Sequence, residues 1–229
     1  MKQIARECAT GYKVATMTVK EPFGEENYEH MRQLLSARVG KSRFKHSLGV
    51  AMTAARLAEV YGYDVDKARM AGLVHDWDKA LSPEESRACV EEFSLVVDPL
   101  VVETMPWLLH GPTAAATLAR DFPELGEDIY QAAARHTSAA LDMTALDMIV
   151  YVSDLIEPNR RFEDVDDVRA AVGKVALEDL FFRALKCIAL FLIGHDRLLH
   201  PVTLEVWNHY VLQRPTMQQG RLAAEHRMR

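Results

Sequence analysis

The sequence predicts an all-α protein with a single main domain. Apolar residues recur at steps of three and four through most of the chain, and no segment alternates strictly between apolar and polar residues as a half-buried strand does. Of the 229 residues, 49% are apolar, which is enough for a substantial core. No internal repeat interrupts this pattern, so we expect one domain over about 27–213, between a flexible arm at 1–26 and a polar tail at 214–229.

The first expected helix covers 42–62 and ends at Gly62, a residue typical of helix C-termini. Its apolar stripe consists of residues three or four positions apart: Phe44, Leu48, Ala51, Ala55 and Ala58. Asp66 is a candidate N-cap for a second helix that runs to about Asp76.

The next helix should begin at Ser82, because Pro83 and Glu85 complete a strong start signal. Thr144 and Asp147 form a weaker signal of the same kind. Further helices are expected over 101–108, 111–121, 125–136, 144–157, 164–172, 174–195 and 203–213.

Charge and hydropathy exclude several classes of protein. The net charge is −6 and the charges are well mixed, with no basic stripe that would favour duplex nucleic acid. The N-terminus lacks the apolar core of a signal peptide, and the apolar segment 184–194 is shorter than the roughly 20 residues that span a bilayer. We therefore expect a cytoplasmic protein that binds no membrane. An amphipathic surface could support a homodimer.

Asp154 is the most informative candidate for a functional site. It lies among apolar residues of an expected helix, where a carboxylate is costly to desolvate unless a cation faces it. Four histidines near helix ends or apolar stripes, and one acid beside them, could share that cation: His46, His75, Asp76, His110 and His136.

Four imidazoles and two carboxylates exceed the ligands of one tetrahedral metal site. They suit two ions with a shared carboxylate, and Asp76 is the natural bridge. Mixed imidazole and carboxylate ligands favour Fe, Mn, Co, Ni or Zn over Mg or Ca. From the spacing of these six residues alone, a metal centre and a set of unrelated polar residues are equally good interpretations.

Ordered motifs resolve this choice through a resemblance. The order His46, His75–Asp76, Asp154 resembles the ligand set of the HD phosphohydrolase superfamily, and more narrowly its bacterial YqeK group. The five blocks that carry the resemblance are RFKHSLGVAMTAARLAEVYGYDVDKARMAGLVHDWDK (43–79), LLHGPTAA (108–115), HT (136–137), LDMIVYVSDLIEPNR (146–160) and LHPVTLEVWNHY (199–210). They span some three quarters of the chain.

The resemblance implies an HD-type helical bundle and a role for each matching residue. The core metal ligands would be His46, His75, Asp76 and Asp154, with His110 and His136 completing a dinuclear centre taken to be iron. Asp76 and Lys79 would be catalytic. The residues expected to face the nucleotide are Lys79, His110, His136, Thr137, Arg160 and His200.

The implied reaction is symmetrical hydrolysis of diadenosine tetraphosphate (Ap4A) to two ADP by a metal-bridged hydroxide. Two alternatives stay open: an HD phosphohydrolase of another nucleotide, and a protein that senses a nucleotide at its metal site without cleaving it.

Two further acidic residues and one loop lie next to these candidates. Asp78 reads as a solvated charge, and Glu157 as a residue that orients Arg160 or is solvated. Where the YqeK group usually has a glycine-containing turn after the HT block, this chain has Ala139 and Ala140, so we expect a different backbone there.

Overall fold

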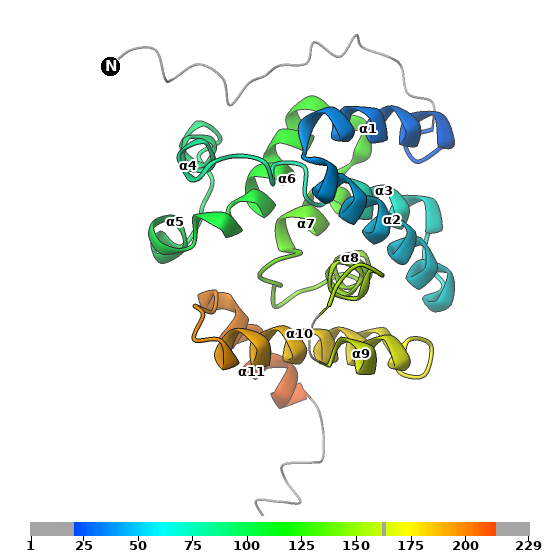
Figure 1. Cartoon of the computed structure of the whole chain (residues 1–229), viewed down its shortest axis with the longest axis vertical. Coiled ribbons are helices and arrows are strands. Elements are labelled where there is room, and N and C mark those ends of the chain that lie inside the picture. Colours follow the sequence, from blue (N-terminus) through cyan, green and yellow to red (C-terminus); the bar gives the residue numbers. More distant parts are fainter. Residues whose placement is uncertain (1–20, 162–163, 214–229) are drawn as a thin grey trace, which may run out of the picture.

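A computed structural model of the chain describes residues 21–161 and 164–213. These residues form eleven α-helices and two short 3-10 helices, with no strand among them (Figure 1). The predicted all-α fold class is therefore confirmed. The helices are α1 Glu25–Arg38, α2 Lys41–Tyr61, α3 Val65–Val74, α4 Pro83–Glu92, α5 Pro99–Thr104, η1 Pro106–Leu108, α6 His110–Asp121, η2 Pro123–Leu125, α7 Glu127–Arg135, α8 Ala145–Ile156, α9 Val165–Ala171, α10 Leu177–Gly194 and α11 Pro201–Gln213.

Helix α8 is the centre of the fold. It packs against α2, α3 and α7 on one side and against α9 and α10 on the other, and Figure 1 looks along it between these two groups. Nine of its twelve residues are buried. A helix that is apolar almost all round must lie inside the protein, which explains why the rest of the bundle is built around this segment.

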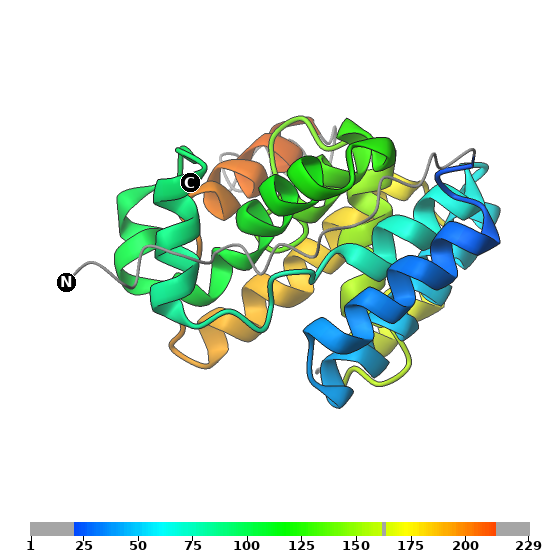
Figure 2. The same ribbon diagram turned by 90° about the horizontal axis from the view of Figure 1, so that it is seen from above.

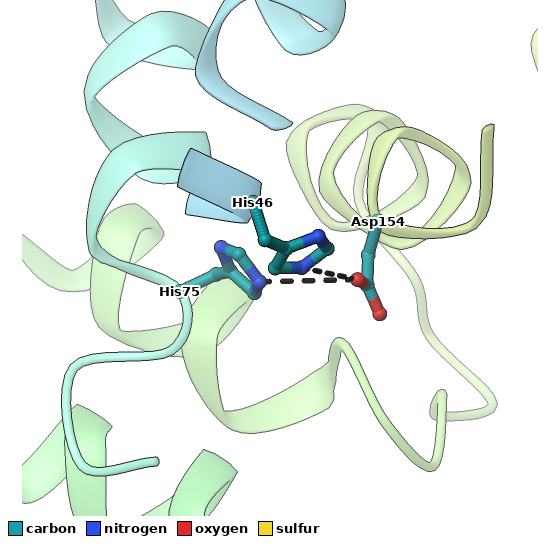
Figure 3. Close-up of side chains that lie close together, drawn as sticks. All are labelled: His46, His75 and Asp154. Atoms are coloured by element: carbon teal, nitrogen blue, oxygen red, sulfur yellow. Dashed lines mark ion pairs between the residues drawn. The ribbon is translucent and has the colours of Figure 1, made fainter. Parts of the chain in front are cut away.

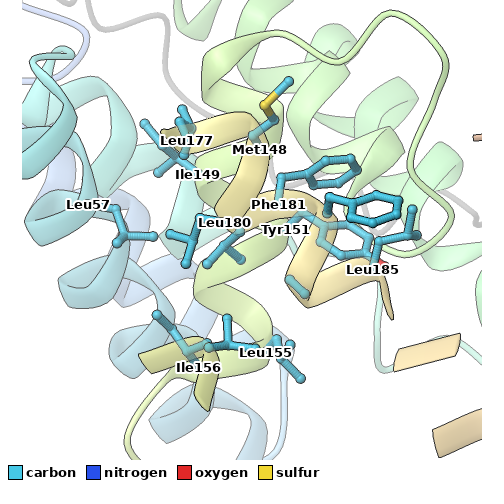
Figure 4. Close-up of a cluster of buried hydrophobic side chains, with 14 of the residues drawn as sticks. Leu57, Met148, Ile149, Tyr151, Leu155, Ile156, Leu177, Leu180, Phe181 and Leu185 are labelled. Carbon is cyan, nitrogen blue, oxygen red and sulfur yellow. The ribbon is translucent and has the colours of Figure 1, made fainter. Parts of the chain in front are cut away.

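Two apolar clusters meet at α8. One joins α8 to α2, α9 and α10 and contains Leu57, Tyr151 and Phe181 (Figure 4). The other joins α8 to α1, α3, α6 and α7. The adjacent residues Ile149 and Val150 belong to different clusters, so the two faces of one helix fasten the two groups together. Helices α4 and α5 lie at one end of the molecule, beside α6 (Figure 2).

The predicted helix ends at Ser82, Thr144 and Gly62 are confirmed. Ser82 and Glu85 form a reciprocal capping box at the start of α4, and Thr144 and Asp147 form another at the start of α8. Gly62 ends α2 in the left-handed conformation, with φ of +75°.

The predicted start of the second helix is wrong by two residues, because Asp64 and not Asp66 accepts the capping hydrogen bond from the Lys67 amide. No helix was predicted before residue 42, so α1 was missed. Its signal was present, because Tyr28, Met31 and Leu35 lie three and four positions apart and are all buried.

The predicted continuous helix over 101–108 is also wrong. Helix α5 ends at Thr104, Met105 leaves the helical conformation with φ of −131° and ψ of 45°, and Pro106 begins η1. A proline lacks the amide donor and disfavours helical geometry at the residue before it, so the break follows from Pro106.

The domain bounds of 27–213 stay a prediction. Residues 1–20, most of the expected arm, and the whole expected tail at 214–229 lie outside the described residues. Within the described part of the chain, none of the helices has the length and apolar character needed to span a bilayer.

Helices α2 and α3 approach each other closely at Gly72, which gives a test of the packing. A Cβ atom on Gly72 would lie 2.9 Å from the Cα atom of Ala51 and 3.0 Å from the carbonyl oxygen of Val50. Both are backbone atoms that cannot turn aside. We expect Gly72→Ala to lower the free energy of unfolding by about 1–3 kcal/mol.

Urea denaturation followed by circular dichroism measures this change. Gly194→Ala is the matched control, because a Cβ atom there meets nothing within 4 Å. It should leave stability unchanged or raise it slightly, since alanine favours a helix more than glycine does. Equal effects of the two substitutions would contradict the close approach at Gly72.

Candidate metal centre

The six predicted ligand residues converge in space from five parts of the chain. They are His46 on α2, His75 and Asp76 in the turn after α3, His110 at the start of α6, His136 at the end of α7, and Asp154 on α8. All except Asp154 are buried, and the Asp154 side chain is 22% exposed. The centre therefore lies inside the bundle with one partly open edge.

The two oxygen atoms of Asp76 face different pairs of imidazoles. Its Oδ1 lies 3.0 Å from Nε2 of His110 and 3.5 Å from Nε2 of His136. Its Oδ2 lies 3.3 Å from Nε2 of His75 and 3.7 Å from Nε2 of His46. A carboxylate placed in this way between two imidazole pairs has the geometry of a bridge.

Asp154 faces one of these pairs. Its Oδ1 lies 2.9 Å from Nε2 of His46 and 4.0 Å from Nε2 of His75 (Figure 3). Among the residues that the structure describes, two groups of three have ligand atoms within 4.8 Å of one another: His46, His75 and Asp154, and His75, Asp76 and His136. His75 belongs to both groups, so they are parts of one cluster.

The hydrogen bonds of the four histidines turn the same ring nitrogen toward the centre. Nδ1 of His75, His110 and His136 each lies 2.7 Å from the carbonyl oxygen three residues earlier in the chain. Nδ1 of His46 lies 3.1 Å from Oε1 of Glu157. Carbonyl and carboxylate oxygens only accept, so each Nδ1 carries the proton and each Nε2 presents a lone pair.

Burial and local charge set the protonation states. Burial lowers the pKa of His110 to about 4, so its ring is neutral at pH 7. Burial alone would raise the pKa of Asp76, but His75, His110 and His136 hold it well below its usual range. The pKa of Asp154 is also held well below its usual range, because the contacts with His46 and Arg160 outweigh its burial.

This arrangement fits a divalent metal ion. The Nε2 atoms of His46 and His75 are buried and have no hydrogen-bond partner, and those of His110 and His136 face each other at 3.0 Å. Lone pairs in such positions repel unless a cation lies between them. Ligand atoms bound to one ion at about 2.1 Å lie about 3 Å or slightly more apart. The distances between ligand atoms here run from 2.9 Å to 4.0 Å.

Three cationic side chains contact the centre. Nη1 of Arg43 lies 2.7 Å from Oδ2 of Asp76, and Nη2 of Arg160 lies 2.5 Å from Oδ1 of Asp154. Nζ of Lys79 lies 3.3 Å from Nδ1 of His110, and burial lowers the pKa of this lysine. Lys79 and Arg160 were predicted from the sequence, but Arg43 was not. Its signal was its position three residues before His46, on the same helix face.

The expectation that Asp78 is solvated is wrong. Asp78 is 1% exposed, pairs with Arg38 at 2.5 Å and accepts a hydrogen bond from Thr117. Helix α3 ends before His75, and the turn that follows directs Asp78 back toward α1 and α6. These contacts tie the turn carrying His75 and Asp76 to two helices.

The interpretation of Glu157 is also wrong, because this side chain is 1% exposed and orients His46 rather than Arg160. Its Oε2 accepts from the backbone and side-chain amides of Asn159. Arg160 donates instead to the side chain and carbonyl oxygen of Asp154.

The structure does not bring Thr137 and His200 into contact with the six residues, as far as the described contacts go. His200 accepts a hydrogen bond from the Val202 amide at the start of α11. Thr137 precedes a loop that α11 touches, through Thr203 Oγ1 and the Ser138 carbonyl oxygen. In this loop Ala139 holds a left-handed backbone with φ of +63°, a conformation that a glycine adopts more easily.

Glu157 offers a test of this geometry. Glu157→Gln keeps the size of the side chain but removes its negative charge. That charge orients the His46 imidazole and makes Nε2 of His46 a stronger ligand. We expect a fall of about 10- to 100-fold in Mn²⁺ affinity, the usual cost of losing such a partner. Calorimetric titration measures this affinity. Glu59→Gln, at an exposed position on the same helix as His46, is the control. Equal affinity in both variants would contradict a metal-binding role for His46.

Comparisons with known proteins agree with this geometry. Residues 43–159 match the HD domain family. Relatives called symmetrical bis(5'-nucleosyl)-tetraphosphatase in Staphylococcus aureus and Bacillus subtilis are each 31% identical to the chain. The first match covers 80% of this chain and 94% of the relative, and the second covers 81% and 98%.

A crystal structure from Clostridium acetobutylicum shares the fold, with a TM-score of 0.75 and 32% identity over 82% of this chain and 98% of that one. It is described as a predicted HD superfamily hydrolase involved in NAD metabolism. Members of the HD-domain family bind divalent metals, as the donor set here would do. The chain belongs to the HD-domain family and, within it, to the YqeK-type group of hydrolases.

Proposed function

We propose that this protein is a metal-dependent hydrolase that cleaves Ap4A symmetrically into two ADP. The observation that carries the proposal is the position of Asp76 between two pairs of imidazoles, in a centre that Arg43, Lys79 and Arg160 contact. The names of the relatives from S. aureus and B. subtilis support the choice of substrate.

Two divalent ions would occupy the centre. His46, His75 and Asp154 would hold one, His110 and His136 the other, and Asp76 would bridge them. Iron is the first expectation, with Mn, Co, Ni or Zn as alternatives of the same ligand preference. When bound, such ions activate a water molecule and neutralise charge on a phosphoryl group.

The charges of the site favour a polyanionic substrate. Three carboxylates are balanced by three cationic side chains: Asp76, Asp154 and Glu157 against Arg43, Lys79 and Arg160. Each divalent ion therefore adds uncompensated positive charge. A chain of four phosphates supplies the negative charge that balances it.

Lys79 and Arg160 would stabilise the phosphate oxygens during the reaction. Phosphoryl transfer depends mainly on positioning and charge neutralisation, and both side chains already lie at the centre. Symmetrical cleavage releases ADP as an anion, which a nearby cation stabilises. Thr137 and His200 would face the nucleotide farther from the reacting phosphorus.

A second candidate is the hydrolysis of another nucleotide. The description of the C. acetobutylicum protein, which mentions NAD metabolism, favours this alternative. A protein that senses a nucleotide without cleaving it would bind Ap4A tightly and show no turnover. The cytoplasmic location, the homodimer and the lack of nucleic-acid binding stay predictions.

The product pattern tests the proposed reaction directly. Purified protein supplied with Fe²⁺ or Mn²⁺ should convert Ap4A into ADP alone, measured by ion-exchange chromatography. AMP and ATP in equal amounts would show attack at a terminal position and would contradict the symmetrical mechanism. A panel that includes deoxynucleotides and NAD-related nucleotides distinguishes the second candidate.

Substitutions should separate metal binding from substrate activation. Asp76→Ala should remove both bound metal and activity, because one bridging ligand holds both ions. Lys79→Ala should keep the metal and lower kcat/KM by roughly 100-fold, the usual effect of losing one charge-stabilising donor. Elemental analysis together with steady-state kinetics checks both. Full metal occupancy in Asp76→Ala would contradict the assignment of the bridge.

A further inference from the structure

A cavity of about 300 Å³ adjoins the metal centre on its His46 side. Helix α2 and the segment after α8 line it with seven residues: Ser42, Arg43, Lys45, His46, Glu157, Asn159 and Arg160. Arg43 and Arg160 contact Asp76 and Asp154, so these two guanidinium groups lie between the cavity and the centre. A ligand in the cavity could therefore continue into the centre without a break in its contacts.

The lining is cationic. Arg43, Lys45 and Arg160 contribute three positive charges, and Glu157 contributes one negative charge. The Glu157 oxygens already accept hydrogen bonds, from Nδ1 of His46 and from both amides of Asn159. This carboxylate is therefore already paired. Arg43 and Arg160 are paired with Asp76 and Asp154 of the centre, so Ser42 and Lys45 add a hydroxyl and a positive charge beyond those pairs.

The start of α2 strengthens this preference for an anion. Its N-cap residue, Gly40, makes no side-chain capping bond, and the first turn contains no acidic residue. The amides of a first turn without such a cap favour a negatively charged group. Ser42 and Lys45 lie in this part of the helix and are exposed.

The cavity lacks the usual features of a base-binding site. None of the seven lining residues is a phenylalanine, tyrosine or tryptophan. The one ring among them, the imidazole of His46, contacts Glu157 through Nδ1 and Asp154 through Nε2 and so belongs to the metal centre. The wall instead presents guanidinium, ammonium, hydroxyl and amide groups, which suit phosphate oxygens. Its volume is at the low end for a ligand site, which suits a phosphate arm better than a whole dinucleotide.

We infer that this cavity binds the phosphate groups of one half of the substrate, a nucleoside diphosphate. It recognises these phosphate groups rather than the base. The inference rests on the proposed function, since a symmetrical cut in a dinucleotide needs one half on each side of the centre. Lys45 and Ser42 become binding residues that neither the sequence motifs nor the metal geometry had singled out.

Lys45→Glu tests the inference, with Arg56→Glu as the matched control. Both positions are exposed cations on α2, and both substitutions change the charge by two units, but Arg56 does not line the cavity. The measurements are KM and kcat for Ap4A, and inhibition by ADP, GDP and inorganic pyrophosphate. Circular dichroism and elemental analysis verify that fold and metal content are unchanged.

Lys45→Glu should raise KM by roughly three- to tenfold, as expected for an exposed charge contact, with little change in kcat. It should weaken inhibition by ADP, GDP and pyrophosphate by similar factors, whereas Arg56→Glu should not. Ser42→Ala should act in the same direction but less strongly. Unchanged KM and inhibition in Lys45→Glu, or a loss confined to adenine nucleotides, would overturn the inference. Failure of the parent protein to cleave Ap4A would instead overturn the proposed function, and the three inhibitors can still be tested for Lys45-dependent binding by calorimetry.

Discussion

The burial of Asp76 is the constraint on which the site depends. A carboxylate with 2% of its surface exposed is stable as an anion only when donors or cations face both of its oxygens. Here Arg43 donates to Oδ2, whereas the other neighbours of the two oxygens are the Nε2 atoms of four imidazoles. Because every imidazole turns Nε2 inward, the arrangement collects lone pairs around an acid, and a divalent cation satisfies all of them at once. The inward-facing lone pairs are unfavourable in free energy without a cation. The same arrangement therefore favours the binding of one.

The packing of the helices brings together ligand residues that are far apart in the sequence. Helix α8 is apolar on two faces and holds Asp154 at the level of His46 on α2, while α3, α6 and α7 each end or begin at a histidine. Placing these histidines at helix termini allows Nδ1 to reach a carbonyl oxygen of the adjoining turn, which fixes the ring and its tautomer. The packing of Gly72 against Ala51 and the contacts of Asp78 with Arg38 and Thr117 keep the intervening turn in place. Stability and metal geometry therefore depend on the same helix contacts.

Much of this was predictable from the sequence, and the failures have local causes. Capping signals at Ser82, Thr144 and Gly62 act within a few residues, so the sequence contains them in full. The convergence of the six ligand residues was predictable because their motifs resemble a known family. The environments of Asp78 and Glu157 were not, because they depend on Arg38 and His46, which lie 40 and 111 positions away. The cavity beside α2 was invisible for the same reason, since it forms only when the segment after α8 packs against the start of that helix.

The central claim is that Asp76 bridges two ions within this cluster. Anomalous diffraction from crystals of the protein loaded with Mn²⁺ or Fe²⁺ tests it most directly. We expect two peaks about 3.5–4 Å apart, as in other two-metal hydrolases. One should lie against His46, His75 and Asp154 and the other against His110 and His136, with a different oxygen of Asp76 on each. A single peak, or peaks away from Asp76, would contradict the account.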